Sequence, residues 1–579
     1  MIDSFVNTSI VKKIHYSFTP SKFRKNHDIP FRIRVGLVGH VNSLNQVQHD
    51  QLLTKFKELM SARSMRDLFE TGGESQSEIT ANSKALDSIT LEFSVVSGLS
   101  SEVERELLTG VLSESLVQYE AILDAPVDEY LSKIVNIEER SQADALIKKC
   151  RKPVVLSHEK KEHIPRQDMV YDFLCKYVDV MVVVCNEHHK DSIFMQSFNS
   201  PVIHMTAGDN IEMQVVKNRG IPIQAVHDFN KFNQYLIRNS LYDKYTKNLS
   251  EDLLPNSRKV KIPENVLAGI KETLFPYYVR GSVIAKDYQT QYLRAGWLVY
   301  CLAPLAVACV AVGVLAPAIA SWAFLIEFFL LLTIFATVSW ADRNKAHKHW
   351  IENRFFTERI RDSVFKASVG VEAGHLRYHR LNDSHHDVND WTTRAFQEVW
   401  NKLPKLNGVN KEKWKASRDY IVKKWIEDQI DYHKKKIGVS DSKATIKIKN
   451  TKGFSKRLER IGMIVFFVAL LSAALHSIPH FVGIDLHAHW FEVILVFFAI
   501  SLPGVGAAIG GFRAHRDYSR IVKNSENMYY ALKQLLTLYR NLESHKGLEV
   551  LLHHTEELML QETQGWLALM RFVELEAEC

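Results

Sequence analysis

Cysteines are few in this sequence, and none of them belongs to a paired motif. Six cysteines occur in 579 residues, without C-x-x-C spacing. Two of them, Cys301 and Cys309, lie in an apolar stretch, and the others are Cys150, Cys175, Cys185 and Cys579. Scattered thiols of this kind are typical of a reducing compartment. We therefore expect neither disulfides nor a zinc knuckle.

Signatures of nucleic-acid binding and of common enzymes are also missing. The net charge of +7 is small for this length, and no long Lys/Arg run with interleaved aromatic residues suggests a nucleic-acid groove. We find neither a P-loop nor a Ser-His-Asp order on a suitable turn. Histidines gather at His375, His379, His385 and His386, beside Asp387, but without an H-E-x-x-H motif or a cysteine. We expect a polar connector there, no metal site, no nucleic-acid partner and a non-enzymatic role.

The N-terminus has no signal-peptide pattern. Its first residues, MIDSFVNTSIVKKIHYSF, mix charged, polar and apolar side chains. They contain no apolar run of about 7–15 residues, which a secretory signal requires. We therefore expect the N-terminal domain to remain in the cytoplasm.

Charged residues are nearly absent from four long stretches. Residues 296–315 contain none and residues 318–340 contain only Glu327, and the apolar pattern recurs at 461–478 and 490–512. Each stretch is long enough to cross a hydrocarbon core of about 30 Å as a helix. Because the connections within each pair are short, we expect two antiparallel transmembrane hairpins.

Lysine and arginine flank both pairs of apolar stretches but are missing from the two turns. Cytoplasmic loops carry such an excess of cations, so all three soluble segments and both termini are predicted in the cytoplasm. The sequence thus predicts a multi-pass protein of the inner (cytoplasmic) membrane. The alternative, buried helices of a soluble protein, needs four unusually long apolar helices flanked by cations. The flanking cations are Arg280, Lys286, Arg294, Arg343, Lys345, Lys348, Lys452, Lys456, Arg457, Arg460, Arg513, Arg516, Arg520 and Lys523.

Three residues in the apolar stretches are candidates for a role in the membrane. A carboxylate in mid-membrane costs roughly 2–3 kcal/mol or more, so Glu327 either lines a pore or is a neutral side chain hydrogen-bonded at a helix interface. Gly506 and Gly510 have the G-x-x-x-G spacing that lets helix backbones approach closely. We interpret this glycine face as a helix-association surface.

The N-terminal third has the pattern of an α/β domain. Residues 31–41 predict a strand and a glycine turn, followed by an amphipathic helix. Strands are also expected at 91–96, ending in Ser97-Gly98-Leu99, at 179–185, ending at Asn186, and at 221–226, with a helix at 212–217 before the last. In α/β folds such strand-to-helix junctions present backbone N–H groups to an anion at the carboxyl edge of the sheet. The fold class is therefore a Rossmann-like α/β domain followed by an all-α membrane region with long cytoplasmic helices.

Several ordered motifs over residues 28–230 resemble one family. They are VGLVGH, SVVSGLSSEVERELL, AILDAPVDEY, YVDVMVVVCN and AGDNIEMQVVKNRGIPI. Together they resemble the SLOG superfamily of Rossmann-like nucleotide-sensing domains, which are related to the LOG phosphoribohydrolases. The resemblance implies a pocket for a nucleotide-derived ligand and no other cofactor. Its candidate residues are Gly36, Gly39, His40, Ser97, Gly98, Leu99, Asn186, Gly208, Asp209 and Glu212.

The chain departs from the hydrolase relatives at one loop. They carry Gly-Gly-x-Gly-Thr-x-x-Glu, whereas this chain keeps only Gly208 and Glu212 and has Asp209 in the threonine place. An acid beside a phosphate is unfavourable unless a cation intervenes. Sensing without turnover is therefore expected, and a degenerate scaffold that binds no small molecule stays open as the alternative.

The helices after each apolar pair resemble a second family. They read HKHWIENRFFTERIRDSVF and YSRIVKNSENMYYALKQLLTLYRNL, and DQIDYH and ETQGW segments accompany them. These features look like SLATT proteins, two-transmembrane effector domains of bacterial systems. The expected domains are a SLOG-like domain at 26–240, a linker at 241–285, a first hairpin with its helix at 286–372, a helical connector at 373–452, and a second hairpin with C-terminal helices at 453–579.

Together the two resemblances imply a membrane effector of bacterial antiphage defence. A nucleotide-derived signal would bind the cytoplasmic domain and gate pore formation or membrane disruption. Two hairpins are too few to enclose a wide pore, so we expect a homo-oligomer. Two alternatives stay open: a membrane-bound nucleotide hydrolase of the phosphoribohydrolase type, and a constitutive ion channel with a cytoplasmic regulatory domain.

Overall fold

The computed structural model falls into two compact units. The sheet unit comprises residues 1–243, 263–277 and 372–407, and the helical unit comprises residues 244–262, 278–371 and 408–579. The connector predicted at 373–452 is thus divided between the two units. The structure describes residues 28–570 except 40, 42–44, 62, 65–66, 69–85, 88, 115–116, 151–152, 157–165, 186–200, 208–210, 218–222, 254–263, 373–389, 407, 439–450, 483–488 and 517.

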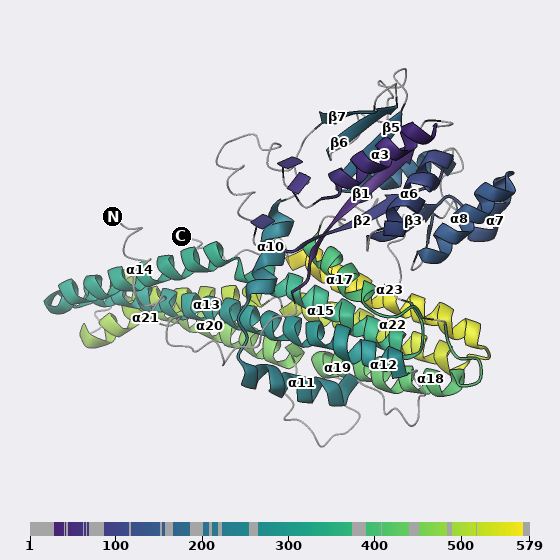
Figure 1. Cartoon of the computed structure of the whole chain (residues 1–579). Helices are drawn as coiled ribbons and strands as arrows, with labels where there is room; N and C mark the ends of the chain where they lie inside the picture. The colour runs from purple at the N-terminus through teal and green to yellow at the C-terminus, as the bar shows by residue number, and fades with distance from the viewer. Residues whose placement is uncertain are drawn as a thin grey trace. The chain divides into compact units, whose positions relative to one another are not determined.

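The sheet unit is built on a seven-stranded sheet of order β4-β3-β2-β1-β5-β6-β7 (Figure 1). All neighbouring strands are parallel except β7, which runs antiparallel to β6. All nine residues of the central strand β1 are buried, as expected for a parallel strand covered on both faces. This sheet confirms the predicted N-terminal α/β domain. The strands are β1 Phe31–Gly39, β2 Leu91–Ser97, β3 Gln118–Leu123, β4 Val154–Val155, β5 Val180–Cys185, β6 Val202–Ala207 and β7 Ile211–Lys217.

Helices pack against this sheet through apolar side chains. Phe173 and Met169 of α9 lie in one buried cluster with Met181 of β5 and Val96 of β2. Helices α3 and α6 lie next to one another beside the sheet (Figure 1). The helices of this unit are α3 Gln46–Leu59, α6 Glu102–Glu114, α7 Val127–Lys133, α8 Ile137–Lys149, α9 Arg166–Tyr177, α10 Ile223–Gln234, α12 Glu264–Gly269, a π-helical turn Ile270–Leu274 and α17 Trp391–Asn401; α11 Asn239–Leu253 begins in it.

Two predicted elements at the end of the α/β domain were wrong. Residues 212–217 form the edge strand β7 and not a helix, because they pair with β6 over nearly their whole length. The expected strand at 221–226 overlaps the start of α10, and its residues 221–222 lie outside the described residues. Ala225, Val226, Phe229 and Phe232 of α10 are buried at helical spacing, so one helix face packs into the core.

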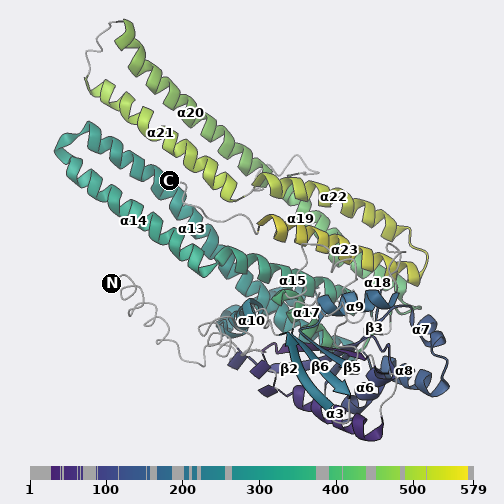
Figure 2. The same cartoon turned by 90° about the horizontal axis from the view of Figure 1, so that it is seen from above.

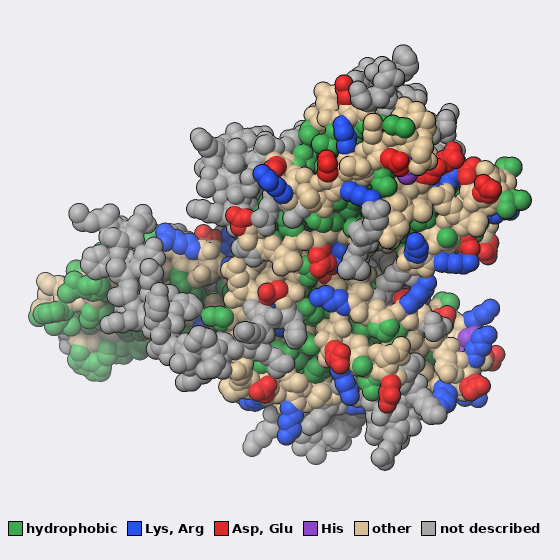
Figure 3. Space-filling view, in the orientation of Figure 1, with side chains coloured by type: hydrophobic (Ala, Val, Ile, Leu, Met, Phe, Trp, Pro, Cys, Tyr) green, Lys and Arg blue, Asp and Glu red, His purple; other side chains and the backbone are tan. Residues whose placement is uncertain are grey.

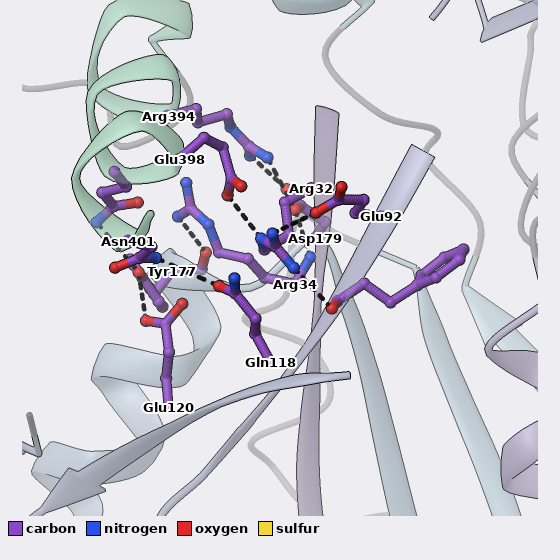
Figure 4. Close-up of polar contacts among 12 residues, drawn as sticks. Arg32, Arg34, Glu92, Gln118, Glu120, Tyr177, Asp179, Arg394, Glu398 and Asn401 are labelled. Atoms are coloured by element: carbon purple, nitrogen blue, oxygen red, sulfur yellow. Dashed lines mark hydrogen bonds and ion pairs between the residues drawn. The ribbon is translucent and has the colours of Figure 1, made fainter. Parts of the chain in front are cut away.

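Helix α17 closes the amino edge of the sheet, although about 170 residues separate it from the last strand (Figure 4). Four of its polar side chains recur at spacings of three and four residues and therefore share one face. Arg394 contacts Asp179, Gln397 contacts Tyr177, Glu398 contacts Arg32 and Asn401 contacts Gln118. All four partners lie at or just before the amino ends of strands.

Two buried ion pairs dominate this contact. One Nη of Arg394 donates to Asp179 at 2.8 Å, its other Nη also contacts that carboxylate, and both side chains are buried. The same carboxylate accepts the backbone N–H of Arg34 at 2.9 Å. Glu398 accepts from Nε of Arg32 at 2.7 Å. Burial alone would raise the pKa of Asp179, but the two neighbouring guanidinium groups hold it below its usual value.

The helical unit contains the four apolar stretches. Four helical segments are long and apolar enough to cross a membrane: Glu264–Leu315, Pro317–Ser368, Thr451–Ser477 and Trp490–Arg540. Their surfaces carry large exposed apolar side chains, such as Phe335 and Phe466. Figure 3 shows hydrophobic side chains gathered at the free end of α14 and α21. The prediction of four membrane-length helices is confirmed.

The membrane-length helices lie alongside one another within this unit (Figure 2). Helix α20 packs along α21, and a short 3₁₀ turn, Pro317–Ile319, joins α13 to α14. Helix α13 begins at Phe275 in the sheet unit and continues into the helical unit without a break. The helices are α13 Phe275–Leu315, α14 Ala320–Asn344, α15 Ala346–Ser368, α18 Trp414–Ile421, a π-helical turn Val422–Ile426, α19 Glu427–Ile437, α20 Thr451–Val482, α21 His489–His515, α22 Tyr518–Arg540 and α23 His545–Met570.

Replacing Arg394 by alanine tests the docking of α17. The substitution leaves the buried Asp179 carboxylate without its ion-pair partner. We therefore expect the free energy of unfolding to fall by roughly 3–5 kcal/mol. Urea unfolding of the detergent-solubilised chain, followed by tryptophan fluorescence, measures this loss. Adding Asp179→Asn should recover part of it, because asparagine keeps an acceptor for the Arg34 N–H without a charge. Equal losses in the single and double variants would contradict the assignment.

Candidate functional site

The carboxyl ends of β1 and β2 lie side by side at the point where the strand order reverses. β1 pairs with β2 on one side and with β5 on the other, and the chain continues from β1 and from β2 toward helices. In open α/β sheets, ligands bind at the carboxyl ends of strands beside such a reversal. This edge is therefore the candidate functional site.

A buried carboxylate occupies the centre of this site. Oε1 of Glu104 accepts the backbone N–H of Gly39 at 3.0 Å. Its Oε2 accepts the backbone N–H of Ser100 at 3.0 Å and the hydroxyl of Ser97 at 2.6 Å. Only 1% of Glu104 is exposed. The two amides and the hydroxyl, which together form an anion cradle, are thus satisfied by an acid of the same chain.

Hydrogen bonds to nearby side chains fix the turn that follows β2. Leu99 adopts a left-handed conformation with φ of 55°, which is uncommon for a residue other than glycine. Its N–H donates to the Ser97 hydroxyl at 3.0 Å. Its carbonyl accepts from Arg105 at 3.0 Å and from the Tyr130 hydroxyl at 2.7 Å. This turn therefore positions Ser97 and Ser100 toward Glu104.

The three described glycines of the predicted pocket are places of close packing. A Cβ on Gly36 would lie 2.9 Å from Sδ of Met181, and one on Gly98 would lie 2.7 Å from Val170. A Cβ on Gly39 would lie 2.5 Å from the hydroxyl of Ser101. Tight packing therefore explains Gly36 and Gly98, whereas the backbone of Gly39 is also a donor in the cradle.

Burial shifts the acid–base behaviour of this edge. It raises the pKa of Glu104, although hydrogen bonds from Ser97, Gly39 and Ser100 and the charge of Arg105 work in the opposite direction. Burial also raises the pKa of Tyr130 to about 12, so its hydroxyl remains a donor at neutral pH. Burial thus favours the neutral forms of both Glu104 and Tyr130.

The other predicted ligand residues do not join this cluster in the described part of the chain. Glu212 lies exposed on the edge strand β7, opposite Thr206 of β6. His40, Asn186, Gly208 and Asp209 lie outside the described residues, as do the five clustered residues His375, His379, His385, His386 and Asp387. No group of three potential metal ligands occurs among the residues that the structure describes.

The three membrane candidates also have defined positions. Glu327 is partly exposed on α14. No described atom approaches a Cβ built on Gly506 or Gly510 within 4 Å, whereas Cβ atoms on the neighbouring Gly504 and Gly511 would touch Val307 and Tyr300 of α13. Within this chain, α21 therefore contacts α13 at Gly504 and Gly511 and not at Gly506 and Gly510.

Glu104 was not among the residues singled out from the sequence, although its motif was. An acid in the first turns of a helix that follows a strand is a recognisable signal, because it lies close to the free N–H groups of that helix. The pattern Ser97 to Glu104 contains this signal, but the sequence does not reveal that the carboxylate turns back toward Gly39.

Replacing Glu104 by glutamine tests the raised pKa. The folded chain binds the proton more tightly than the unfolded chain, so this acid favours folding at low pH and opposes it once the pH rises through the folded-state pKa. We therefore expect Glu104→Gln to gain stability relative to the parent as the pH rises, measured by urea unfolding at several pH values. Glu102→Gln, which changes an exposed acid on the same helix, is the control. A difference that is independent of pH would contradict the raised pKa.

Comparisons with protein-family models, with curated proteins and with solved structures found no match for this chain.

Proposed function

We propose that this chain is a membrane effector controlled by a nucleotide-derived ligand. The ligand binds the carboxyl edge of the sheet unit, and the four apolar helices form two transmembrane hairpins that open or disrupt the membrane. The observation that carries the proposal is the presence, in one chain, of an α/β anion cradle and four membrane-length helices.

The docking of α17 supports the first hairpin. Helix α17 follows α14 in the chain, yet it packs on the sheet that precedes α13. Both ends of the α13–α14 pair therefore lie on one side of any membrane that the pair crosses. Two crossings in opposite directions satisfy this condition, and the short turn Pro317–Ile319 suits them.

Contacts around α20 and α21 support the second hairpin in the same way. Helix α19 precedes this pair and α22 follows it, and the two pack together. Lys452 at the start of α20 forms an ion pair of 2.6 Å with Glu526 of α22. Segments before and after α20–α21 thus share one side. The flanking lysines and arginines favour the cytoplasm for that side and for both termini, in the inner membrane.

The ligand proposal follows from the cradle around Glu104. In related folds, backbone N–H groups at a strand-to-helix turn hold a phosphate. Here the carboxylate of Glu104 accepts these donors, so a phosphate has to displace it or meet it protonated. A ligand that binds one arrangement better than the other shifts the balance between them.

The SLOG-like and SLATT-like motifs extend this proposal to bacterial antiphage defence. They suggest a signal made during infection, a homo-oligomeric assembly and a pore-forming or membrane-disrupting output. We propose sensing and not turnover, because the loop from Gly208 to Glu212 departs from that of the hydrolase relatives.

Liposome leakage tests the proposed function. The full chain, reconstituted into vesicles loaded with a self-quenching dye, is exposed to a panel of linear and cyclic nucleotides. We expect one class of nucleotide to cause leakage. Glu104→Gln should lower the half-maximal nucleotide concentration by roughly tenfold, because it removes a negative charge from the anion site. Glu102→Gln, the exposed control, should leave that concentration unchanged.

Three outcomes would contradict the proposal. Leakage that is equal with and without nucleotide would indicate a constitutive channel. Conversion of the nucleotide, detected by chromatography of the same samples, would indicate an enzyme. A folded, reconstituted protein that no nucleotide activates would exclude control by such a ligand.

A further inference from the structure

A polar cavity lies within the helical unit. Its volume is about 100 Å³, it is partly open to solvent, and helices α15, α19 and α23 enclose it. Measured in this way a single water needs about 10–15 Å³, so the cavity has room for a small polar group of several atoms. The lining residues are Ile351, Arg354, Phe355, Glu358, Arg361, Gln429, Tyr432, Lys436, Met559, Glu562 and Thr563.

Cations outnumber carboxylates around this cavity. Three cationic side chains, Arg354, Arg361 and Lys436, face two carboxylates, Glu358 and Glu562. Arg361 lies 2.8 Å from Glu358, and Arg354 is farther from the same carboxylate, at 3.6 Å. Glu358 is thus shared by two arginines.

Lys436 and Glu562 complete this charge distribution. Glu562 lies 3.7 Å from Nε2 of His433. Lys436 has no ion-pair partner among the residues that the structure describes, and its Nζ lies 4.2 Å from the centre of the Tyr432 ring. Burial raises the pKa of Glu562, and the charge of Lys436 acts against this rise. The wall thus carries three cations for two carboxylates.

The hydroxyl of Tyr432 lies close to these cations. It is 3.5 Å from Nη2 of Arg354. Burial would raise the pKa of this phenol, yet Arg354 and Lys436 lower it below its ordinary value. Both cations thus lie close enough to Tyr432 to act on its hydroxyl.

We infer that this cavity binds an oxyanion of the phosphate class. Arg354 and Arg361 on α15 and Lys436 on α19 approach the space from two helices, and Thr563 on α23 adds a hydroxyl from a third. A guanidinium group can bind two oxygens of one phosphate, and a lysine adds a point charge. Ile351, Phe355 and Met559 form an apolar part of the wall, which strengthens such contacts by excluding water.

The bound oxyanion joins three helices of the cytoplasmic bundle. Helix α15 directly follows the apolar helix α14, and only Lys345, in a left-handed conformation with φ of 46°, separates them. An anion that ties α15 to α19 and α23 thus acts on the helix next to a membrane-length segment. This site is independent of the nucleotide site proposed for the sheet unit.

Equilibrium dialysis with radiolabelled inorganic phosphate tests the inference on the full chain in a maltoside detergent, which contains no phosphate. We expect saturable binding that Lys436→Met and Arg354→Met each weaken by roughly tenfold. Lys435→Met changes an exposed lysine on the same helix and should leave binding unchanged. Thermal unfolding of each variant shows whether it is folded, and the partly exposed Lys436 provides a test if Arg354→Met does not fold.

A second arm distinguishes a soluble phosphate from a lipid headgroup. Mixed micelles containing phosphatidic acid replace the inorganic phosphate, and the same variants are compared. Binding of either probe that depends on Lys436 and Arg354 but not on Lys435 supports the site and identifies the source of the phosphate. Absence of binding to both probes, or equal weakening by Lys435→Met, overturns it. The Lys436 and Arg354 variants leave the sheet unit unaltered, so loss of binding in them is distinguishable from failure of the proposed nucleotide site.

Discussion

The buried ion pairs between α17 and the amino edge of the sheet are the contact on which the α/β domain depends. Asp179 and Arg32 lie where the strands begin, and both are shielded from water. Asp179 takes its ion pair from Arg394 of α17, and Arg32 pairs both with Glu398 of α17 and with Glu92 of β2. A buried charge without such a partner is costly. The domain therefore requires a segment that lies far beyond its last strand.

Aromatic packing accompanies these ion pairs. The ring of Trp391 lies 5.5 Å from that of Phe232 and 6.2 Å from that of Phe229 in α10, and Phe229 in turn packs on Phe31 at the start of β1. The polar contacts thus fix the position of α17 along the sheet, while the apolar contacts bury hydrophobic surface. The opposite edge has a different character, because there a single buried acid satisfies the donors of a potential ligand site. One edge of the sheet is closed by another helix, and at the other edge a side chain accepts the free backbone donors.

The sequence predicted the large features and missed those that depend on distant pairing. Four apolar stretches and the alternating strand at 31–41 are local patterns, and the structure has the corresponding helices and strand. Strand β7 was predicted as a helix because its short, exposed sequence shows no clear hydrophobic periodicity. It is a strand because it pairs with β6. The role of α17 was missed since its partners lie some 200 residues earlier. Glu104 was quoted within a motif, but its direction depends on Gly39, which only the folded chain brings near.

The interleaving of the two units has a consequence for biosynthesis. The chain passes between them after residues 243, 262, 277, 371 and 407. A ribosome therefore delivers β1 to β7 first, then α13 and α14, and only afterwards the helix that covers the amino edge. Until then the nascent sheet exposes Asp179 and Arg32 to water. The α/β domain therefore completes its fold only after the first two apolar helices have left the ribosome, which ties its maturation to the synthesis of those helices.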